Sequence, residues 1–331
     1  MSAEASPQNP RSETARRRRL ALGALLIAAG LVAGLGLAEG FVRLFFPTFA
    51  PSSLVEFSYS AGPLLLAQPE TQTRQISEAG DYDVAVRINS HGLRDVNDVA
   101  TAGADDIVVV GDAFAWGWGV EAQDRFSDQL QVLSGRRTFN LATPTDIEGY
   151  AALLAYAKQL GSRAGRVVVI VDMEKDLQAA GRAMPSPASG SPLGAWLTRH
   201  SALYLLASRA FEGAFSPRAG PSGLGVTPNE YDPANIDRAA NELEKIAEQY
   251  RMTVVLIPSR ALWMGDDRSV EERVNTAFTV ALQRRGIDVL DLQPVLEAQG
   301  SPLSYYFAND GHWTAGGHAL VAHAISQHLA R

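Results

Sequence analysis

The sequence predicts an α/β domain built on a parallel sheet with helices on both faces, preceded by a membrane-spanning helix. From residue 105 onward, short apolar segments rich in Val and Ile alternate with longer segments of helical apolar spacing. This pattern is typical of parallel strands that are buried on both faces and joined by amphipathic helices. Near the N-terminus, four consecutive arginines precede residues 20–38, which carry no charge.

The alternation sets the expected elements of the domain in chain order. We expect strands at 107–110, 138–141, 167–171, 253–257 and 287–292, and helices at 123–133, 150–160, 233–250, 270–284 and 315–329. Residues 178–230 interrupt this order with a loop at 185–192, a helix at 196–211 and a loop at 216–228. We interpret them as an insertion or lid near the site and not as a separate domain.

The N-terminal region is expected to consist of a basic cytoplasmic tail at 1–19 and a transmembrane signal anchor at 20–39. As a helix, residues 20–38 rise about 28 Å, close to the hydrocarbon thickness of a bilayer. The arginines favour the cytoplasmic side, so the remainder should be exported. Cleavage as a signal peptide and a buried core helix remain alternatives. Gly36 and Ala38 have the spacing of a cleavage site, although the apolar segment exceeds the roughly 7–15 residues usual for one.

Residues 40–104 are expected to form a connector and docking segment. Residues 41–47 are predicted to continue the anchor into the membrane interface, because aromatic side chains favour that level. Residues 47–80 are rich in Pro, Ser, Gly and Gln, which predicts little regular structure, and 84–88 show a weak strand alternation. Residues 89–95 are interpreted as a turn that docks on the domain.

Composition limits the classes of function. The chain of 331 residues is 46% apolar and 20% charged, which is ample for a core. Its net charge is −7, and because residues 1–19 carry +3, the remainder carries −10. Such an acidic remainder argues against nucleic-acid binding, which requires a basic face. The absence of cysteine excludes disulfides and thiolate chemistry.

Two short segments carry most of the functional information. In the first, an apolar strand runs into Gly111, Asp112 and Ala113 and then into a glycine-rich turn. The second reads Asp310-Gly311-His312-Trp313. Together they resemble the first and last sequence blocks of the SGNH, or GDSL-type, hydrolases. The resemblance implies a flavodoxin-like doubly wound sheet over 105–331, with the site at the carboxyl edge of the strands.

The resemblance also implies roles for individual residues. The family's serine nucleophile corresponds to Ala113, and a methyl group cannot attack an ester. His312 corresponds to the general base, and Asp310 to the carboxylate that orients its imidazole. Gly111 and Asp112 match the first block.

The two middle blocks, which supply oxyanion donors in the family, depart from its pattern. Thr145 or a neighbour replaces the second-block glycine, although its backbone N–H could still donate. Lys175 occupies the place of the third-block asparagine. It could donate a charge-assisted hydrogen bond to a ligand, turn to solvent, or pair with Asp112 or Asp176.

Aromatic and histidine residues near the two end blocks have alternative interpretations. Trp116, Trp118 and Trp313 are expected to cluster, either as a platform for sugar rings or as core residues. His318 and His323 lie five positions apart on one helix and are expected to pack or face solvent. No metal site and no cofactor is expected.

The form Asp-x-His-Trp resembles the alginate O-acetyltransferase-like branch of the family, which acts on polysaccharides in the periplasm. Because three blocks are altered together, we expect a degenerate site that binds a glycan or acylated ligand, or a scaffold for envelope polysaccharide or cell-wall biosynthesis proteins. The expected location is a bacterial-type inner membrane, single-pass, with a periplasmic domain. A carbohydrate esterase or O-acyltransferase whose serine is replaced in this chain stays open, as does a hydrolase in which His312 and Asp310 activate water.

Overall fold

The structure, a computed structural model, describes residues 10–50, 55–77, 79–179, 192–215, 229–265 and 268–331. The chain divides into two compact units. One contains residues 1–51 and 190–216, and the other contains the rest of the chain. Each unit is described separately below.

The larger unit is organised around five parallel strands in the order β6-β5-β7-β8-β9. They are β5 (Ile107–Val110), β6 (Thr138–Asn140), β7 (Arg166–Asp172), β8 (Arg251–Ile257) and β9 (Asp288–Asp291). Counted along the chain, this is the 2-1-3-4-5 order of flavodoxin-like sheets. The predicted fold class and all five predicted strands are confirmed.

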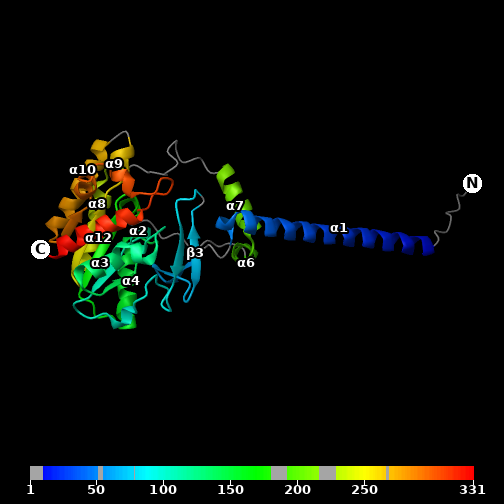
Figure 1. The fold of residues 1–331 in the computed structure, drawn as a ribbon, viewed down its shortest axis with the longest axis horizontal. Coiled ribbons are helices and arrows are strands. Elements are labelled where there is room, and N and C mark those ends of the chain that lie inside the picture. Colours follow the sequence, from blue (N-terminus) through cyan, green and yellow to red (C-terminus); the bar gives the residue numbers. More distant parts are fainter. Residues whose placement is uncertain (1–9, 51–54, 78, 180–191, 216–228, 266–267) are drawn as a thin grey trace, which may run out of the picture. The chain divides into compact units, whose positions relative to one another are not determined.

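Helices cover both faces of this sheet (Figure 1). On one face lie α2 (Ala113–Trp116), α3 (Phe126–Ser134), α11 (Gln293–Glu297) and α12 (Ala315–Leu329). On the other lie α4 (Ile147–Leu160), α8 (Pro233–Ala247) and α10 (Arg268–Arg284). Side chains alternate between the two cores, since Val108 packs with the second set and Val109 with the first. Burial on both faces explains the continuous apolar strands.

Two antiparallel hairpins precede the sheet. The first pairs β1 (Phe57–Ala61) with β2 (Leu64–Ala67), and the second pairs β3 (Gln72–Ile76) with β4 (Asp83–Arg87). The prediction of little regular structure at 47–80 is therefore wrong, whereas the predicted strand at 84–88 is confirmed as β4. All four β2 residues are buried, but this apolar segment has only four residues and lies in a region rich in Pro, Ser, Gly and Gln, which dominated the prediction.

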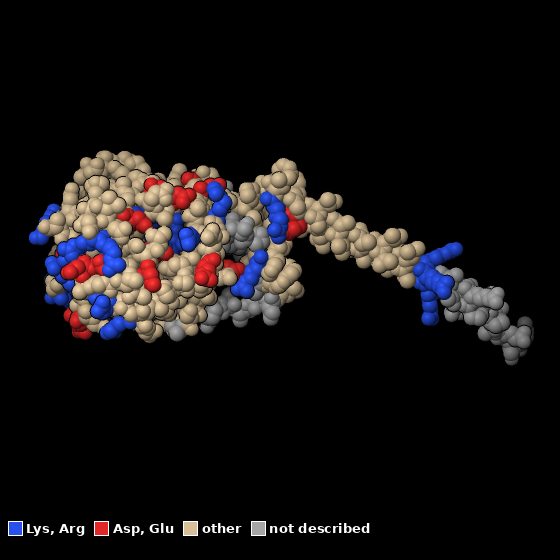
Figure 2. All heavy atoms as spheres, turned by 60° about the horizontal axis from the view of Figure 1, so that its bottom comes forward, with Lys and Arg blue, Asp and Glu red and all other residues tan. Residues whose placement is uncertain are grey.

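The smaller unit contains α1 (Pro10–Phe45), α6 (Pro192–His200) and α7 (Ala202–Phe215). The segment of α1 from Arg17 to Phe45 is long and apolar enough to cross a membrane. Residues 10–19 of the predicted tail thus share one helix with the predicted anchor and with residues 41–45 of the predicted interfacial continuation. Figure 2 shows the middle of this helix as a surface without charged side chains.

The predicted insertion at 178–230 differs from its expected form. Its helix, expected at 196–211, is two helices that meet at Ser201. Residues 190–216 group with α1 and not with the sheet, which corrects their assignment to the α/β domain. The loops expected at 185–192 and 216–228 lie outside the described residues, apart from Pro192, where α6 begins.

Candidate functional site

The candidate site lies where β5, β7 and β8 end at the carboxyl edge of the sheet. Gly111 follows β5 directly, and a Cβ atom there would come within 2.6 Å of the Ala115 side chain and 2.8 Å of Ile170. Only glycine fits this close approach. Asp112 then caps α2, because its side chain accepts a hydrogen bond from the Phe114 backbone N–H at 2.9 Å. Ala113 is the first residue of that helix.

His312 and Asp310 form a hydrogen-bonded dyad. His312 Nδ1 lies 2.5 Å from Asp310 Oδ1, and because a carboxylate only accepts, Nδ1 is the donor. The His312 backbone N–H donates to the same oxygen at 2.9 Å. His312 Nε2 is buried and has no hydrogen-bond partner among the residues that the structure describes. The imidazole is therefore held in the tautomer that presents a free acceptor nitrogen.

Tyr82 and Trp118 extend the dyad. The Tyr82 hydroxyl donates to Asp310 Oδ2 at 2.9 Å and accepts from Trp118 Nε1 at 2.8 Å. Burial alone would raise the pKa of Asp310, but the hydrogen bonds and charge of His312, with the Tyr82 hydrogen bond, lower it to about 2. Asp310 is therefore ionised at neutral pH. Tyr82 was not identified from the sequence, because it lies in the connector, in no recognisable pattern.

Two aromatic rings enclose the imidazole of His312. The centroid of Phe114 lies 5.0 Å away, and that of Trp118 lies 5.6 Å away in a stacked arrangement. Trp116 and Trp313, by contrast, have no exposed surface and belong to the core. Of the two interpretations of these tryptophans, the structure supports core packing for Trp116 and Trp313 and leaves Trp118 beside the dyad.

The two predicted oxyanion donors, Thr145 and Lys175, do not donate hydrogen bonds to the dyad. The Thr145 backbone N–H donates to the carbonyl oxygen of Thr143 at 2.6 Å, and so it is already used within its own turn. Lys175 is exposed, although its charge acts on the buried Asp112 carboxyl. The structure does not bring either group into a hydrogen bond with the dyad.

Three buried carboxyl groups lie beneath the site, on Asp112, Asp172 and Asp176. Asp176 accepts hydrogen bonds from the Tyr150 hydroxyl at 2.8 Å and from the Asp172 backbone N–H at 3.0 Å. Burial raises the pKa of all three, and mutual repulsion adds to this for Asp172, whose pKa is about 8, and for Asp176. Among the described residues, Asp112 Oδ2 has no hydrogen-bond partner. A raised pKa favours the protonated form of a carboxyl group, and for Asp172 this preference extends to about pH 8.

A buried ion pair borders the loop that carries the dyad. Arg260 follows β8, and its Nη2 lies 3.0 Å from Oε1 of Glu174, which follows β7. A Cβ atom at Gly311 would come within 2.7 Å of the Arg260 guanidinium. A side chain at position 311 would therefore require the Arg260 guanidinium to move. The sequence signal for Arg260 was a charged residue just beyond a buried strand.

The segment 89–95 docks on the turn that follows the nucleophile position. Arg94 donates to the carbonyl oxygens of Gly117 at 2.5 Å and Val120 at 2.6 Å, and its guanidinium lies 4.6 Å from the ring centroid of Trp116. Burial and the nearby charge of Arg125 lower the pKa of Arg94 to about 9. Arg94 therefore holds the turn that places Trp118 against His312. This agrees with the predicted docking role.

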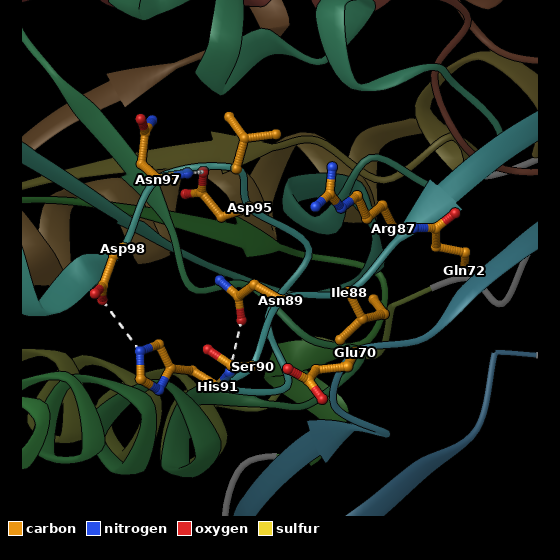
Figure 3. Close-up of a pocket in the computed structure, with 11 residues that line it drawn as sticks. Glu70, Gln72, Arg87, Ile88, Asn89, Ser90, His91, Asp95, Asn97 and Asp98 are labelled. Carbon is orange, nitrogen blue, oxygen red and sulfur yellow. Dashed lines mark hydrogen bonds and ion pairs between the residues drawn. The ribbon is translucent and has the colours of Figure 1, made fainter.

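The cavities on the docking segment are separate from the dyad. One, of about 430 Å³, is lined mainly by polar side chains (Figure 3). Within it, His91 Nε2 lies 3.1 Å from Asp98 Oδ1. A second, of about 390 Å³, shares Gln72, Arg87, Asp95 and Val96 with the first. In the part of the chain that the structure describes, no three His, Asp or Glu side chains are grouped to hold a metal ion.

Comparison with known proteins places this geometry in context. Residues 229–331 match the family model described as SGNH hydrolase-like domain, acetyltransferase AlgX. No curated protein matches the chain.

Solved structures of similar fold have low sequence identity to the chain. A lipolytic protein of the G-D-S-L family from Veillonella parvula is 12% identical, with 68% of this chain and 98% of that chain covered and a TM-score of 0.44. An α/β hydrolase, LAE5, from the metagenome of Lake Arreo is 13% identical, with coverages of 70% and 98% and a TM-score of 0.42. Axe2, an acetylxylan esterase from Geobacillus stearothermophilus, is 8% identical, with coverages of 70% and 97% and a TM-score of 0.41.

Proposed function

We propose, on the premise that the chain carries an SGNH hydrolase-like domain, that this domain binds a glycan or acylated ligand without turning it over. In this proposal α1 anchors the chain in a bacterial-type inner membrane, and the domain faces the extracytoplasmic side. The partners that suit this placement are proteins of envelope polysaccharide or cell-wall biosynthesis. The observation that carries the proposal is Ala113, which carries only a methyl group and directly precedes Phe114, the ring that packs on His312 of the formed dyad.

The nucleophile position cannot begin covalent catalysis. Ala113 has no atom that can form an acyl-enzyme, so the base His312 has no hydroxyl proton to remove. The two replaced oxyanion donors support the same conclusion. The Thr145 N–H is already used by Thr143, and Lys175 extends into solvent. Preorganised donors at such positions contribute about 10²–10³-fold each to rate, and that contribution is missing.

The remaining groups suit recognition of a polar ligand. His312 Nε2 is a buried acceptor without a partner, and a ligand hydroxyl could supply the missing donor. The rings of Phe114 and Trp118 beside it offer apolar surface of the kind that packs on a sugar ring or an acetyl group. Binding without turnover requires only these contacts.

A direct test measures binding and hydrolysis of the same ligand. The full chain in nanodiscs is titrated with an O-acetylated oligosaccharide while tryptophan fluorescence is followed, and the de-O-acetylated oligosaccharide serves as the matched ligand. We expect saturable binding that His312→Gln weakens and His323→Gln does not, with the ligand recovered intact by mass spectrometry. Release of acetate by the unaltered chain would overturn the proposal.

The dyad geometry favours a second candidate, a hydrolase that activates water. His312 is oriented by an ionised carboxylate and has a free Nε2, which is the arrangement of a general base. This candidate predicts acetate release by the unaltered chain that is lost in His312→Ala. It also predicts insensitivity to serine-directed reagents, since no serine is involved.

A further inference from the structure

The helix pair α6–α7 is attached to α1 near the end of its apolar segment. Glu39 of α1 accepts hydrogen bonds from the Ser201 hydroxyl at 2.8 Å, the Ala202 N–H at 2.9 Å and the Leu203 N–H at 3.0 Å. It therefore occupies the N-terminal end of α7, where exposed N–H groups favour a negative charge. Arg43, one turn further along α1, donates to the His200 carbonyl oxygen at 2.7 Å, at the end of α6.

The position of this attachment along α1 matches the thickness of a bilayer. Glu39 is the first charged residue after Arg19, and the separation of 20 positions between the two residues corresponds to about 30 Å of helix. A carboxylate at the edge of the hydrocarbon is costly unless it is paired and hydrogen-bonded. The donors from α7, together with the Arg43 guanidinium 2.6 Å from Glu39, meet this requirement.

Large exposed apolar side chains lie on α6 and at the C-terminal end of α1. The exposed fraction is 55% for Trp196, 65% for Leu193, 56% for Phe41 and 60% for Phe45. We refer to these four residues as the interfacial patch. The ring of Trp196 stacks on His200 at 4.8 Å, which ties it to the end of α6 that Arg43 binds. Figure 1 shows α6 and α7 gathered at the C-terminal end of α1.

We propose that the interfacial patch docks on the membrane that α1 spans, at the boundary between lipid headgroups and acyl chains of the extracytoplasmic leaflet. This rests on the anchoring in the proposed function. The occupant is lipid because Phe41 and Phe45 continue the apolar surface of α1 about one bilayer thickness from the arginines, and because Trp196 stacks on His200, whose carbonyl oxygen Arg43 binds. Tryptophan and phenylalanine favour this level, where an apolar ring meets water. In this proposal the α6–α7 helix pair lies at the membrane surface and stabilises the position of α1 in the bilayer.

Environment-sensitive labels on single cysteines test this placement, since the chain has no cysteine of its own. Three full-length variants are reconstituted in vesicles of phosphatidylcholine and phosphatidylglycerol: Trp196→Cys, Leu31→Cys in the middle of α1, and Lys245→Cys on exposed α8. Lipids brominated near the headgroup or deep in the acyl chain then report depth by quenching.

We expect the label at position 196 to emit at shorter wavelength than the label at 245. We also expect the shallow bromines to quench it more strongly than the deep bromines do. The label at 31 should be quenched by the deep bromines, and the label at 245 by neither. Quenching at 31 with none at 196 would overturn the inference and leave the anchor intact. A shifted emission at 196 without bromine quenching would also overturn it, because a protein would then cover the patch. No quenching at 31 would refute the anchoring itself.

A second variant tests the attachment. Adding Glu39→Ala to the Trp196→Cys chain removes the hydrogen bonds to the start of α7 and should abolish most of the shallow quenching at 196. Adding it to the Leu31→Cys chain should leave the deep quenching unchanged. Equal quenching at 196 with and without Glu39 would contradict the attachment.

Discussion

The Tyr82 hydroxyl donates a hydrogen bond to Asp310 at 2.9 Å, although 228 positions separate the two residues in the chain. The hairpin β3–β4 is therefore part of the candidate site and not only a connector to it. Tyr82 satisfies the carboxylate oxygen that His312 leaves free. The Tyr82 oxygen also accepts a hydrogen bond from Trp118 Nε1. One hydroxyl therefore orients both the Asp310 carboxylate and the Trp118 ring, which stacks on the His312 imidazole.

Removing this hydroxyl should destabilise the domain. Tyr82→Phe leaves Asp310 Oδ2 and Trp118 Nε1 without a partner in partly buried surroundings, which we expect to lower the free energy of unfolding by about 1–3 kcal/mol. Chemical denaturation measures the change. Tyr231→Phe, on an exposed ring, is the matched control and should have little effect. Equal stability of both variants would show that the hydrogen bond contributes nothing.

Restoring the nucleophile alone should not restore an esterase. Ala113→Ser supplies the hydroxyl next to a formed dyad, but the oxyanion donors at Thr145 and Lys175 remain displaced. We expect hydrolysis of a short acyl aryl ester to stay within about tenfold of the unaltered chain, because each missing donor costs about 10²–10³-fold.

The full chain and its Ala113→Ser variant are compared with the double variant Ala113→Ser, His312→Ala as the background. A large gain that disappears in the double variant would identify the chain as an esterase or acyltransferase that lacks one oxygen atom. Circular dichroism of all three proteins verifies that they are folded.

Substitution of Arg94 in the docking segment should lower the stability of the domain. Arg94→Lys cannot reproduce the forked donation to the Gly117 and Val120 carbonyl oxygens, which then remain buried without that donor. We expect a loss of about 2–4 kcal/mol in the free energy of unfolding and a changed Trp118 fluorescence. Arg137→Lys, whose ion pair with Asp106 is half exposed, should cost less than about 1 kcal/mol. Similar losses in the two variants would refute the special role of Arg94.

The buried carboxyl groups predict a pH dependence of stability. The folded-state pKa of Asp172 is about 8, above its value in an unfolded chain of about 3.9. The folded chain holds a proton that the unfolded chain releases, so the free energy of unfolding should fall as the pH rises from about 4 to about 8. Asp172→Asn removes this dependence and should raise stability at pH 8 by about 1–3 kcal/mol.

Denaturation at pH 5 and pH 8 checks this expectation. Asp237→Asn, at an exposed carboxylate, is the matched control and should leave the pH profile unchanged. A steeper profile for Asp172→Asn than for the unaltered chain would mean that Asp172 is ionised in the folded state.

The local sequence pattern predicts a strand well where the residues of that strand form a recognisable apolar segment. The five strands of the sheet are continuous apolar segments because both of their faces are buried, and they were located within two residues of their ends. The hairpins before residue 80 were missed for the opposite reason. The apolar segment of β2 has only four residues in a region rich in Pro, Ser, Gly and Gln, and β3 is mostly polar, so neither has a pattern that indicates a strand.

Residue type and local periodicity are enough to predict the fold class, the apolar helix at the N-terminus, and the lack of a nucleophilic atom at Ala113. The folded structure was needed to show that Tyr82 and Trp118 support the dyad, that Thr145 is used within its own turn, and that residues 190–216 group with α1. These are contacts between segments far apart in the chain or backbone geometries within a loop. Their formation depends on three-dimensional packing, which no local pattern records.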